Sequence, residues 1–505
     1  PNLLYESLFR NHEKNKAPFL NLINGKVICY ASFLCMARKY ANTFKNFGLS
    51  KGDRVAIQVE KSPESLAIYA ACVQSGLVFI PLNIAYTPNE IYYFLEDSQA
   101  KLFVGEFSRE RELSKILDKS SVIFETLDVG GNGSLANKSQ KMIESFSIIE
   151  MRNDELVAIL YTSGTTGKPK GAMLSQKNLL SNAKELVNIW KFNKNDVLLH
   201  SLPIYHTHGL FVAVNVTLLS GASIIFLPKF DVDLVIKNIS KATVMMGVPT
   251  FYKRLLEEKR FNREITKNLR VFISGSAPLL SETFFEFEKR TGHRILERYG
   301  MTETNMNTSN PYEGERRPGT VGLPLPGVEL RIVDSETGKV ISDGDIGEIE
   351  VRGENVFKGY WNLPEKTKMD FTADNYFITG DLGFIDSDGH LNLSGRNKDL
   401  IISGGLNVYP AEIEQIIDSL PEVSESAVIG LPHQDYGEGV TAAVTIEPGL
   451  EFNEYQIKKR LREKLASFKI PIKILRLDSM PKNAMGKIEK AVLRDLFKNE
   501  YSTNS

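Results

Sequence analysis

Short apolar runs alternate with helical segments along the first 150 residues of the chain. Residues 53–59 predict a strand, and Ser62 followed by Pro63 predicts the start of a helix. That helix should end at Gly76, and the apolar run 77–80 predicts the next strand. This rhythm favours right-handed β-α-β units and a largely parallel sheet.

The same pattern continues to about residue 394. Strands are predicted near 156–160, 243–246, 271–274 and 348–352, with a helix over 177–190 that Ser175 caps and another that follows 247. The longest apolar stretch, 210–227, contains polar residues and Gly221, so it predicts a helix, a turn and a buried strand instead of a membrane span.

The last hundred residues predict a separate small α+β unit. A helix should begin at Pro410, followed by strands at 425–429 and 440–446, a helix over 453–467, a strand near 472 and a final helix over 487–499. This pattern predicts a three-stranded sheet with helices on it. The small and charged residues of 394–399 show no apolar period, so we expect a domain boundary there.

The predicted fold class is therefore α/β, with a large N-terminal domain of mostly parallel sheets packed with helices and a small mobile α+β C-terminal domain. The expected domains are residues 1–394 and 400–505, with a hinge over 395–399 centred on Lys398.

Composition agrees with a globular chain of more than one core. The 505 residues are 42% hydrophobic and 24% charged, and the net charge of −1 argues against a polyanion-binding surface, so nucleic acid is not an expected partner. Neither a secretory signal nor a peroxisomal address is recognisable, and no membrane partner is expected. Three cysteines without metal-ligand spacing indicate a reducing compartment, and we expect the cytoplasm.

Candidate chemistry begins in the segment 161–171, which follows the predicted strand 156–160. Its glycines allow tight turns that expose backbone N–H groups, and its hydroxyls and lysines suit a polyphosphate. The Walker A pattern fails because Pro169 stands where its second glycine would be. The candidate phosphate-binding residues are Thr162, Ser163, Gly164, Thr165, Thr166, Gly167, Lys168 and Lys170.

Three further segments offer polar groups at predicted strand ends. The small residues Gly275, Ser276, Ala277 and Pro278 would let a flat ring approach the backbone. Thr302 and Glu303 offer the oxygen ligands that Mg²⁺ with phosphate partners requires, and Asp381 could accept from ribose hydroxyls. His206 and His208 have no third ligand nearby, so zinc is not predicted.

Five strings resemble the core motifs of the adenylate-forming enzymes, which include acyl-CoA synthetases, luciferases and peptide-synthetase adenylation domains. They are 161–171, Tyr-Gly-Met-Thr-Glu at 299–303, Thr-Gly-Asp at 379–381, residues 395–399 and Gly486-Lys487, all in family order. The resemblance extends from about residue 3 to residue 498. It implies a two-step reaction, in which a carboxylate attacks the α-phosphate of ATP and the thiol of CoA then displaces AMP.

The resemblance also implies residue roles. The catalytic residues would be Lys487, Thr302, Glu303 and Lys168, with Glu303 on Mg²⁺ and Lys398 at the hinge. Outside the phosphate loop, the nucleotide would contact Gly275, Ser276, Ala277, Pro278, Glu297, Arg298, Tyr299, Gly300, Met301, Asp381 and Arg396. Gly404 and Gly405 would line the passage of CoA.

Within the family the chain is most similar to malonyl-CoA synthetases, in the strings 202–211, 246–252 and 297–312. A second carboxylate buried in the acyl pocket needs a cation and donors. The resemblance assigns Arg254 and Ser276 to it, with His206 close by. Phe284 and Phe285 replace basic residues that some relatives carry, so methylmalonate, short-chain and aryl acids stay open.

Two functions of a different class are a non-catalytic acyl-adenylate binder and a carrier-protein-loading module. Intact Lys487, Glu303 and Lys168 disfavour the first, and no carrier domain after residue 505 disfavours the second. The expected partners are ATP, CoA and a short dicarboxylate, and the chain is expected to be a monomer or a homodimer.

Overall fold

The computed structural model describes residues 1–162, 168–404, 406–465 and 467–502. By internal contacts the chain divides into two compact units. The first comprises Pro1–Thr162, Lys170–Glu329 and Val351–Asn375, and the second contains Leu330–Glu350 and Tyr376–Ser505. This division describes packing, whereas the boundary expected at 394–400 concerns a movement, so the hinge stays a prediction.

The first unit contains a nine-stranded sheet with a parallel centre. Antiparallel strands β2, β14 and β15 extend its two ends. Its order is β15 (Leu323–Pro324), β14 (Asn305–Ser309), β13 (Leu296–Met301), β12 (Val271–Ser274), β11 (Val244–Gly247), β9 (Val197–His200), β10 (Ser223–Phe226), β1 (Pro18–Leu22) and β2 (Val27–Cys29).

A seven-stranded sheet belongs to the same unit. Five of its strands are parallel, and β8 and β18 add an antiparallel edge beside β7. Its order is β18 (Gly359–Tyr360), β8 (Gly171–Ser175), β7 (Leu156–Tyr161), β4 (Val78–Pro81), β3 (Arg54–Gln58), β5 (Leu102–Glu106) and β6 (Ile123–Leu127). The predicted mostly parallel α/β architecture is confirmed.

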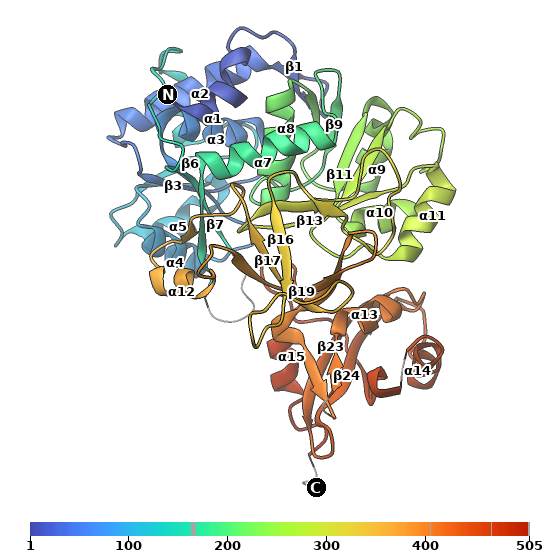
Figure 1. Ribbon diagram of the computed structural model, residues 1–505. Coiled ribbons are helices and arrows are strands. Elements are labelled where there is room, and N and C mark those ends of the chain that lie inside the picture. The colour runs from blue at the N-terminus through green and yellow to red at the C-terminus, as the bar shows by residue number, and fades with distance from the viewer. Residues whose placement is uncertain (163–167, 405, 466, 503–505) are drawn as a thin grey trace. The chain divides into compact units, whose positions relative to one another are not determined.

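Helices pack around these two sheets, and Figure 1 shows α7 and α8 side by side. They are α1 (Leu3–Leu8), α2 (Tyr30–Asn46), α3 (Pro63–Ser75), α4 (Pro88–Ser98), α5 (Glu110–Leu117), α6 (Ser134–Gln140), α7 (Gln176–Ile189), α8 (Ala213–Ser220), α9 (Val232–Asn238), α10 (Pro249–Leu256), α11 (Ser281–Thr291) and α12 (Pro364–Met369). Ser62 caps α3 and Ser175 caps α7, as predicted. Gly76 ends α3 with a φ of 68°, a left-handed value that favours glycine.

The second unit holds two further sheets. One has the order β16 (Glu329–Val333), β17 (Gly347–Arg352), β19 (Phe377–Ile385) and β20 (Leu391–Arg396). The other has the order β22 (Leu406–Val408), β21 (Ile401–Ser403), β24 (Gly437–Ile446) and β23 (Val423–His433), with β25 (Lys473–Arg476) paired to β24.

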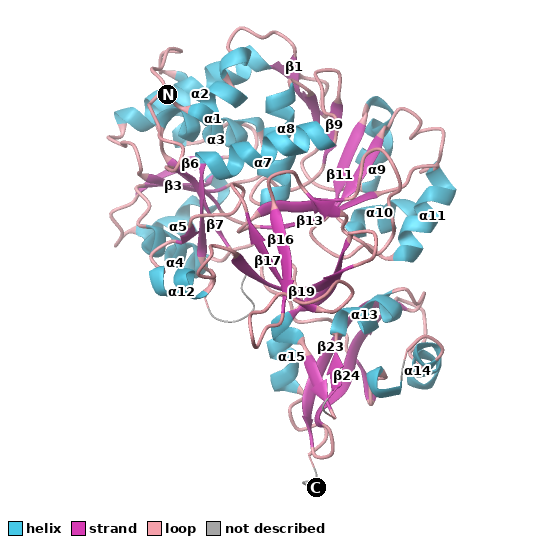
Figure 2. Ribbon diagram, viewed as in Figure 1, coloured by secondary structure: helices cyan, strands magenta, loops and turns pink. Residues whose placement is uncertain are grey.

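Helices α13 (Pro410–Asp418), α14 (Glu454–Arg462) and α15 (Lys490–Leu496) accompany this last sheet (Figure 2). The α+β character is confirmed, but the predicted three-stranded sheet is wrong because the sheet has five strands. Strands β21 and β22 have three residues each, too few for an alternating pattern to be recognised.

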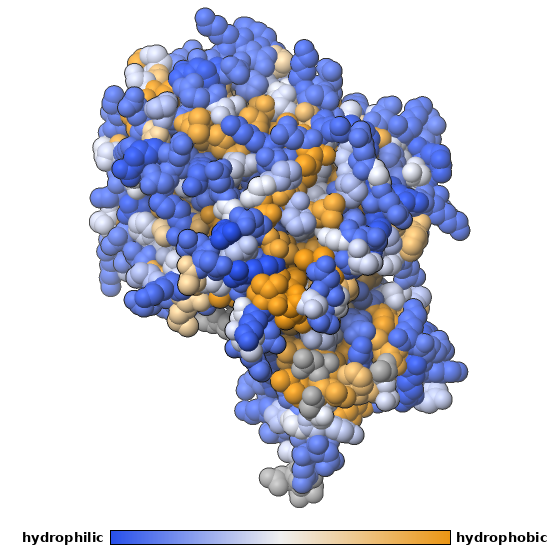
Figure 3. Space-filling view, viewed as in Figure 1, coloured by the Kyte–Doolittle hydropathy of each residue, from blue (hydrophilic) through white to orange (hydrophobic). Residues whose placement is uncertain are grey.

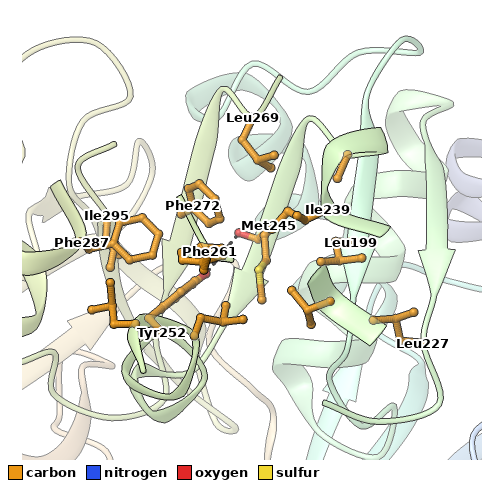
Figure 4. Packing of buried hydrophobic residues seen from close by; sticks show 14 of the residues in the cluster. Leu199, Leu227, Ile239, Met245, Tyr252, Phe261, Leu269, Phe272, Phe287 and Ile295 are labelled. Atoms are coloured by element: carbon orange, nitrogen blue, oxygen red, sulfur yellow. Dashed lines mark hydrogen bonds between the residues drawn. The ribbon is translucent and has the colours of Figure 1, made fainter. Parts of the chain in front are cut away.

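A cluster of buried aromatic and aliphatic side chains fixes α10 and α11 against β11 and β12 (Figure 4). Phe272 packs edge-on to Phe287 with ring centroids 4.9 Å apart, and the Tyr252 hydroxyl donates to the Ile273 carbonyl at 2.6 Å. Edge-to-face aromatic pairs stabilise a core beyond their buried area. The cluster therefore holds the strand ends of β11 and β12 in a fixed arrangement.

The surface shown in Figure 3 is mainly hydrophilic over the N-terminal helices. Among the residues that the structure describes, none of the helices has the length and hydropathy that crossing a bilayer requires. Cys72 is buried, whereas Cys29 and Cys35 are half-buried.

Candidate active site

The candidate phosphate loop joins two antiparallel strands, β7 and β8. Its base is closed where the Thr162 N–H donates to the Lys170 carbonyl at 2.8 Å. Just before it, the Tyr161 hydroxyl donates to the Asp97 carboxylate at 2.7 Å. Lys168 is exposed. Both ends of the loop are therefore fixed by the sheet. The candidates Ser163, Gly164, Thr165, Thr166 and Gly167 lie outside the described residues.

Tyr360 connects this hairpin to the candidate metal ligand. Strand β18 pairs with β8, and this places the Tyr360 ring 5.5 Å from the Lys170 ammonium. The Tyr360 hydroxyl donates to Oε2 of the buried Glu303 at 2.8 Å. Tyr360 lies outside the motifs that are recognisable in the sequence. A buried carboxylate must have a donor, but that requirement does not reveal which residue supplies it.

Glu303 lies in the turn between β13 and β14, next to the half-buried Thr302. The Thr304 N–H donates to the Met301 carbonyl at 3.2 Å and closes this turn. The position just before this turn requires a glycine, Gly300, because a Cβ there would lie 2.3 Å from the Asn305 carbonyl oxygen. The motif predicted to contact the α-phosphate and metal is thus held in a tight, antiparallel connection.

The turn after β12 carries the candidate adenine-binding residues. Gly275 is buried, whereas Ser276, Ala277 and Pro278 are exposed. Behind the turn, the Leu279 N–H donates to Glu297 Oε2 at 3.1 Å. Ser276 has a φ of 74°, a left-handed value that costs a non-glycine residue about 1–2 kcal/mol. Such strain is common at binding sites, where the surrounding structure maintains it.

Arg298 lies directly beneath this turn and is 3% exposed. A Cβ on Gly275 would lie 2.1 Å from the guanidinium carbon, so the glycine makes room for the charge. Among the described residues, Nε and Nη2 of Arg298 have no hydrogen-bond partner. Burial lowers its pKa to about 10, which leaves it charged at neutral pH. A buried cation with unused donors suits an anionic ligand.

Glu297, next to Arg298 on β13, does not neutralise it at pH 7. Burial raises the pKa of the Glu297 carboxyl to about 8, although the Leu279 N–H and Arg298 oppose this shift. At pH 7 the carboxyl is therefore mostly protonated and neutral. Arg298 keeps its positive charge available for a ligand.

His208 completes the same cluster. Its Nδ1 lies 3.3 Å from the Ser276 hydroxyl, and its buried Nε2 has no partner in the described part of the chain. Burial, followed by the charge of Arg298, lowers the pKa of His208 well below its usual range, so the ring is neutral. His206 is half-buried beside Tyr205, with ring centroids 4.7 Å apart. The structure thus brings His208, not His206, against Ser276.

Arg254 is placed differently from Arg298. It is exposed on α10, and its guanidinium carbon lies 5.0 Å from the centre of the Phe230 ring. Its assignment to the second carboxylate stays a prediction. Its own neighbourhood offers an aromatic face and solvent, in contrast to the enclosed position of Arg298.

Tyr299, the predicted adenine-stacking residue, is 6% exposed on β13, and Met301 is half-buried.

The remaining candidates belong to the second unit. Asp381 and Arg396 are partners across β19 and β20, and their side chains form an ion pair at 2.6 Å. The Asp381 N–H donates to the Thr379 hydroxyl at 3.0 Å. A carboxylate and a guanidinium are therefore presented together from adjacent strands.

Lys487 is exposed at the end of a compact turn. Its N–H donates to the Asn483 side chain at 3.1 Å, and its carbonyl accepts from the Asn483 N–H at 2.9 Å. Lys398 is exposed, although partial desolvation of its ammonium lowers its pKa. The Gly404 N–H donates to the Tyr436 carbonyl at 2.8 Å, and Gly405 lies outside the described residues.

Comparison with known families now adds to this geometry. The AMP-binding enzyme family matches residues 9–361, and the AMP-binding enzyme C-terminal domain matches residues 412–487. The chain belongs to the AMP-binding enzyme family. The first match includes the phosphate loop, the Arg298 cluster and Glu303, and the second extends to Lys487.

Individual relatives of this AMP-binding enzyme are similar over most of its length. Malonate–CoA ligase from Arabidopsis thaliana is 36% identical over 490 residues, which cover 90% of this chain and 80% of the relative. Oxalate–CoA ligase from the same plant is 34% identical over 464 residues, which cover 89% of each chain. The crystal structure of ATP-bound MatB from Rhodopseudomonas palustris is 52% identical, with a TM-score of 0.95 over 99% of both chains.

Proposed function

We propose that this AMP-binding enzyme is a malonate–CoA ligase, which converts malonate, ATP and CoA to malonyl-CoA, AMP and pyrophosphate. The family and the names of its relatives support an acid–CoA ligase. The single observation that carries the choice of a dicarboxylic acid is the buried guanidinium of Arg298. Its Nε and Nη2 have no partner among the described residues.

The first step of the proposed reaction activates one carboxylate of malonate. Its oxygen attacks the α-phosphorus of ATP, the new O–P bond forms, and the bond to pyrophosphate breaks. In the second step the CoA thiolate attacks the acyl carbon, and AMP departs with the bonding electrons. The chain needs no covalent intermediate, because orientation and charge stabilisation supply the acceleration.

The second carboxylate of malonate stays unreacted and must be held in the acyl pocket. Arg298 supplies the positive charge, the neutral His208 supplies a ring nitrogen, and Ser276 supplies a hydroxyl. The resemblance to adenylate-forming enzymes implies a nucleotide contact for Arg298, but its enclosed position below Gly275 suits the acyl end better. A monocarboxylic acid would leave this buried charge without a partner, which costs several kcal/mol.

Charge on the phosphates is balanced by Lys168 and Lys170, with the Thr162 N–H fixed at the base of the loop. Asp381 would accept from the ribose hydroxyls, and Arg396 would keep it oriented at 2.6 Å. Lys487 would stabilise charge that develops on the α-phosphate, and Lys398 would be the hinge of the small domain. Thr302 would contact the α-phosphate, Tyr299 the adenine ring and Gly404 the pantetheine of CoA.

Mg²⁺ fits the donor set around Glu303. The described residues contain no group of three or more His, Cys, Asp or Glu that could hold a metal ion by themselves. Mg²⁺ in nucleotide sites is ordinarily held by one or two carboxylates together with substrate phosphates. Glu303 would be that carboxylate, oriented by Tyr360. When bound, the ion would neutralise charge on the phosphates.

The test is nucleotide and pyrophosphate analysis with a panel of acids, with and without CoA. Malonate should give AMP and pyrophosphate, and a thioester only when CoA is present. Methylmalonate, oxalate, butyrate and benzoate make up the rest of the panel. A higher kcat/KM for butyrate than for malonate would contradict the dicarboxylate assignment while leaving the ligase chemistry in place.

Cellular location and assembly belong to the same proposal. We propose a cytoplasmic enzyme that is monomeric or homodimeric. Light scattering on the purified protein and fractionation of the source cells measure these properties directly.

A further inference from the structure

Lys61 is a cation that the proposed chemistry does not use. It follows β3 and precedes Ser62, the N-cap of α3. Its ammonium donates to the Leu202 carbonyl at 2.8 Å and to the His200 carbonyl at 3.2 Å, and it lies 2.7 Å from Nδ1 of His200. The face of Phe226 is 4.7 Å away. Burial lowers the pKa of Lys61 well below its usual range, but three acceptors match the three N–H donors of its protonated form.

His200 links Lys61 to the Gly209 carbonyl through its two ring nitrogens. It is 1% exposed at the end of β9, and its Nε2 lies 2.7 Å from the Gly209 carbonyl. Nε2 therefore carries the proton and donates to Gly209, while Nδ1 accepts from Lys61. Burial and the Lys61 charge lower the pKa of His200 well below its usual range, in agreement with a neutral ring.

The hydrogen bond from Lys61 to the Leu202 carbonyl and the one from His200 to the Gly209 carbonyl hold opposite ends of the segment 202–209. Leu202 begins the segment 202–209 and Gly209 ends it, so one ammonium fixes the first end directly and the last end through His200. The ends also touch, because a Cβ on Gly209 would lie 1.8 Å from the Pro203 carbonyl oxygen. The segment then enters the π-helix His208–Val212, and the Leu210 N–H donates back to the His206 carbonyl at 3.0 Å.

This loop carries His206 and His208, and His208 contacts Ser276 at 3.3 Å. Lys61 follows β3 of the seven-stranded sheet, whereas His200 ends β9 and Ser276 follows β12 of the nine-stranded sheet. Lys61 thus connects the two sheets of the first unit at the place where the acyl-pocket loop begins and ends.

We propose that Lys61, acting through His200, is a positioning residue that holds the loop 202–209 so that His208 faces the acyl substrate. The inference rests on the proposed function only in taking His208 as part of the acyl pocket. Lys61 itself touches no substrate. Replacement of Lys61 should therefore lower kcat/KM for the acid and leave ATP binding largely unchanged.

The first experiment compares Lys61→Met and Lys61→Arg with the wild type. Met keeps an unbranched apolar side chain but removes the charge and donors. We expect kcat/KM for the acid to fall about 10- to 100-fold in Lys61→Met, because small displacements of substrate-positioning groups have effects of this size. KM for ATP should change less than about twofold. Lys61→Arg should restore part of the loss.

His12→Phe is the matched control. The buried His12 lies 2.7 Å from the Leu218 carbonyl and stacks on Tyr30, so it also joins distant segments, but among the described residues it has no hydrogen bond or ring contact with the loop 202–209. Its melting temperature should fall while the KM values for acid and ATP stay unchanged. Equal rises of both KM values in Lys61→Met, or a kcat/KM for the acid equal to that of the wild type, would overturn the inference.

Hydrogen exchange measured by mass spectrometry separates this inference from the proposed function. In Lys61→Met, peptides covering 200–212 should exchange faster than in the wild type, while peptides from α7 should not change. Unchanged exchange over 200–212 would refute the positioning role even if activity fell. If the wild type is inactive with malonate but adenylates another acid, the proposed substrate fails, and the same comparison is made with that acid.

Discussion

Replacement of Arg298 by Met tests how the acyl pocket recognises a second carboxylate. Met retains an unbranched side chain in a position that is 3% exposed, but it removes the positive charge and the two unpartnered nitrogens. Malonate would then bury a carboxylate without a cation. Butyrate carries a methyl group in its place and loses nothing.

The expected magnitude follows from the burial of the site. Breaking a buried charge pair by removing one partner costs about 3–5 kcal/mol. Expressed at the transition state, this is on the order of 10²–10³-fold in kcat/KM for malonate. The ratio of the kcat/KM values for malonate and butyrate should fall by the same factor.

The stability of the same variant provides a second readout. In the absence of substrate, Arg298 buries a charge with unused donors, and such a group destabilises the fold. Arg298→Met should therefore melt at the same temperature as the wild type or higher, although its activity with malonate falls. A lower melting temperature with an unchanged substrate ratio would show that Arg298 is a structural residue.

Arg254→Leu is the matched comparison, because the sequence predicts Arg254 as the cation. Arg254 is exposed over Phe230, and an exposed charge contributes about 0–1 kcal/mol. If Arg298 holds the carboxylate, the substrate ratio should change less than about fivefold in Arg254→Leu. A ratio that falls on the order of 10²-fold in Arg254→Leu and stays unchanged in Arg298→Met would refute the reasoning and support the sequence-based assignment.

Three more predictions concern other parts of the site. Tyr360→Phe removes the donor to the buried Glu303 carboxylate and should lower kcat/KM for ATP about 10- to 100-fold; an unchanged value at limiting Mg²⁺ would exclude the orienting role. Glu297 has its pKa raised to about 8, so the folded protein binds more protons than the unfolded chain between pH 4.5 and 8, and its stability falls as pH rises through that window. Between pH 6 and pH 8, the free energy of unfolding in urea should fall by about 2 kcal/mol less in Glu297→Gln than in the wild type. An equal fall in both proteins would contradict the raised pKa. Lys487→Ala should slow adenylation about 10²–10³-fold and largely spare thioester formation from supplied malonyl-adenylate, and equal loss in both half-reactions would be evidence against a role confined to the first.

Most of the fold was predictable because its signals are local. Ser62 with Pro63 and Gly76 marked the two ends of α3, and an uninterrupted apolar run marked β7. The strands β21 and β22 were missed because three residues cannot show a period, and their pairing depends on a distant strand. Local chemistry therefore predicts elements, whereas the number of strands in a sheet depends on contacts across the chain.

The candidate site was predictable only where one segment carries several functional groups. The phosphate loop and the turn with Glu303 are such segments. Tyr360 and Lys61 are not, since each acts on residues 57 or more positions away. Arg298 was recognised as a site residue, but its burial and unused donors are properties of packing that no sequence pattern contains.

The most direct test of the central claim is a product analysis of one reaction. Purified protein with malonate, ATP, Mg²⁺ and CoA should yield malonyl-CoA and AMP in equal amounts, with pyrophosphate, as measured by chromatography and mass spectrometry. Formation of ADP and phosphate, or absence of malonyl-CoA while another acid is converted, would contradict the proposed function.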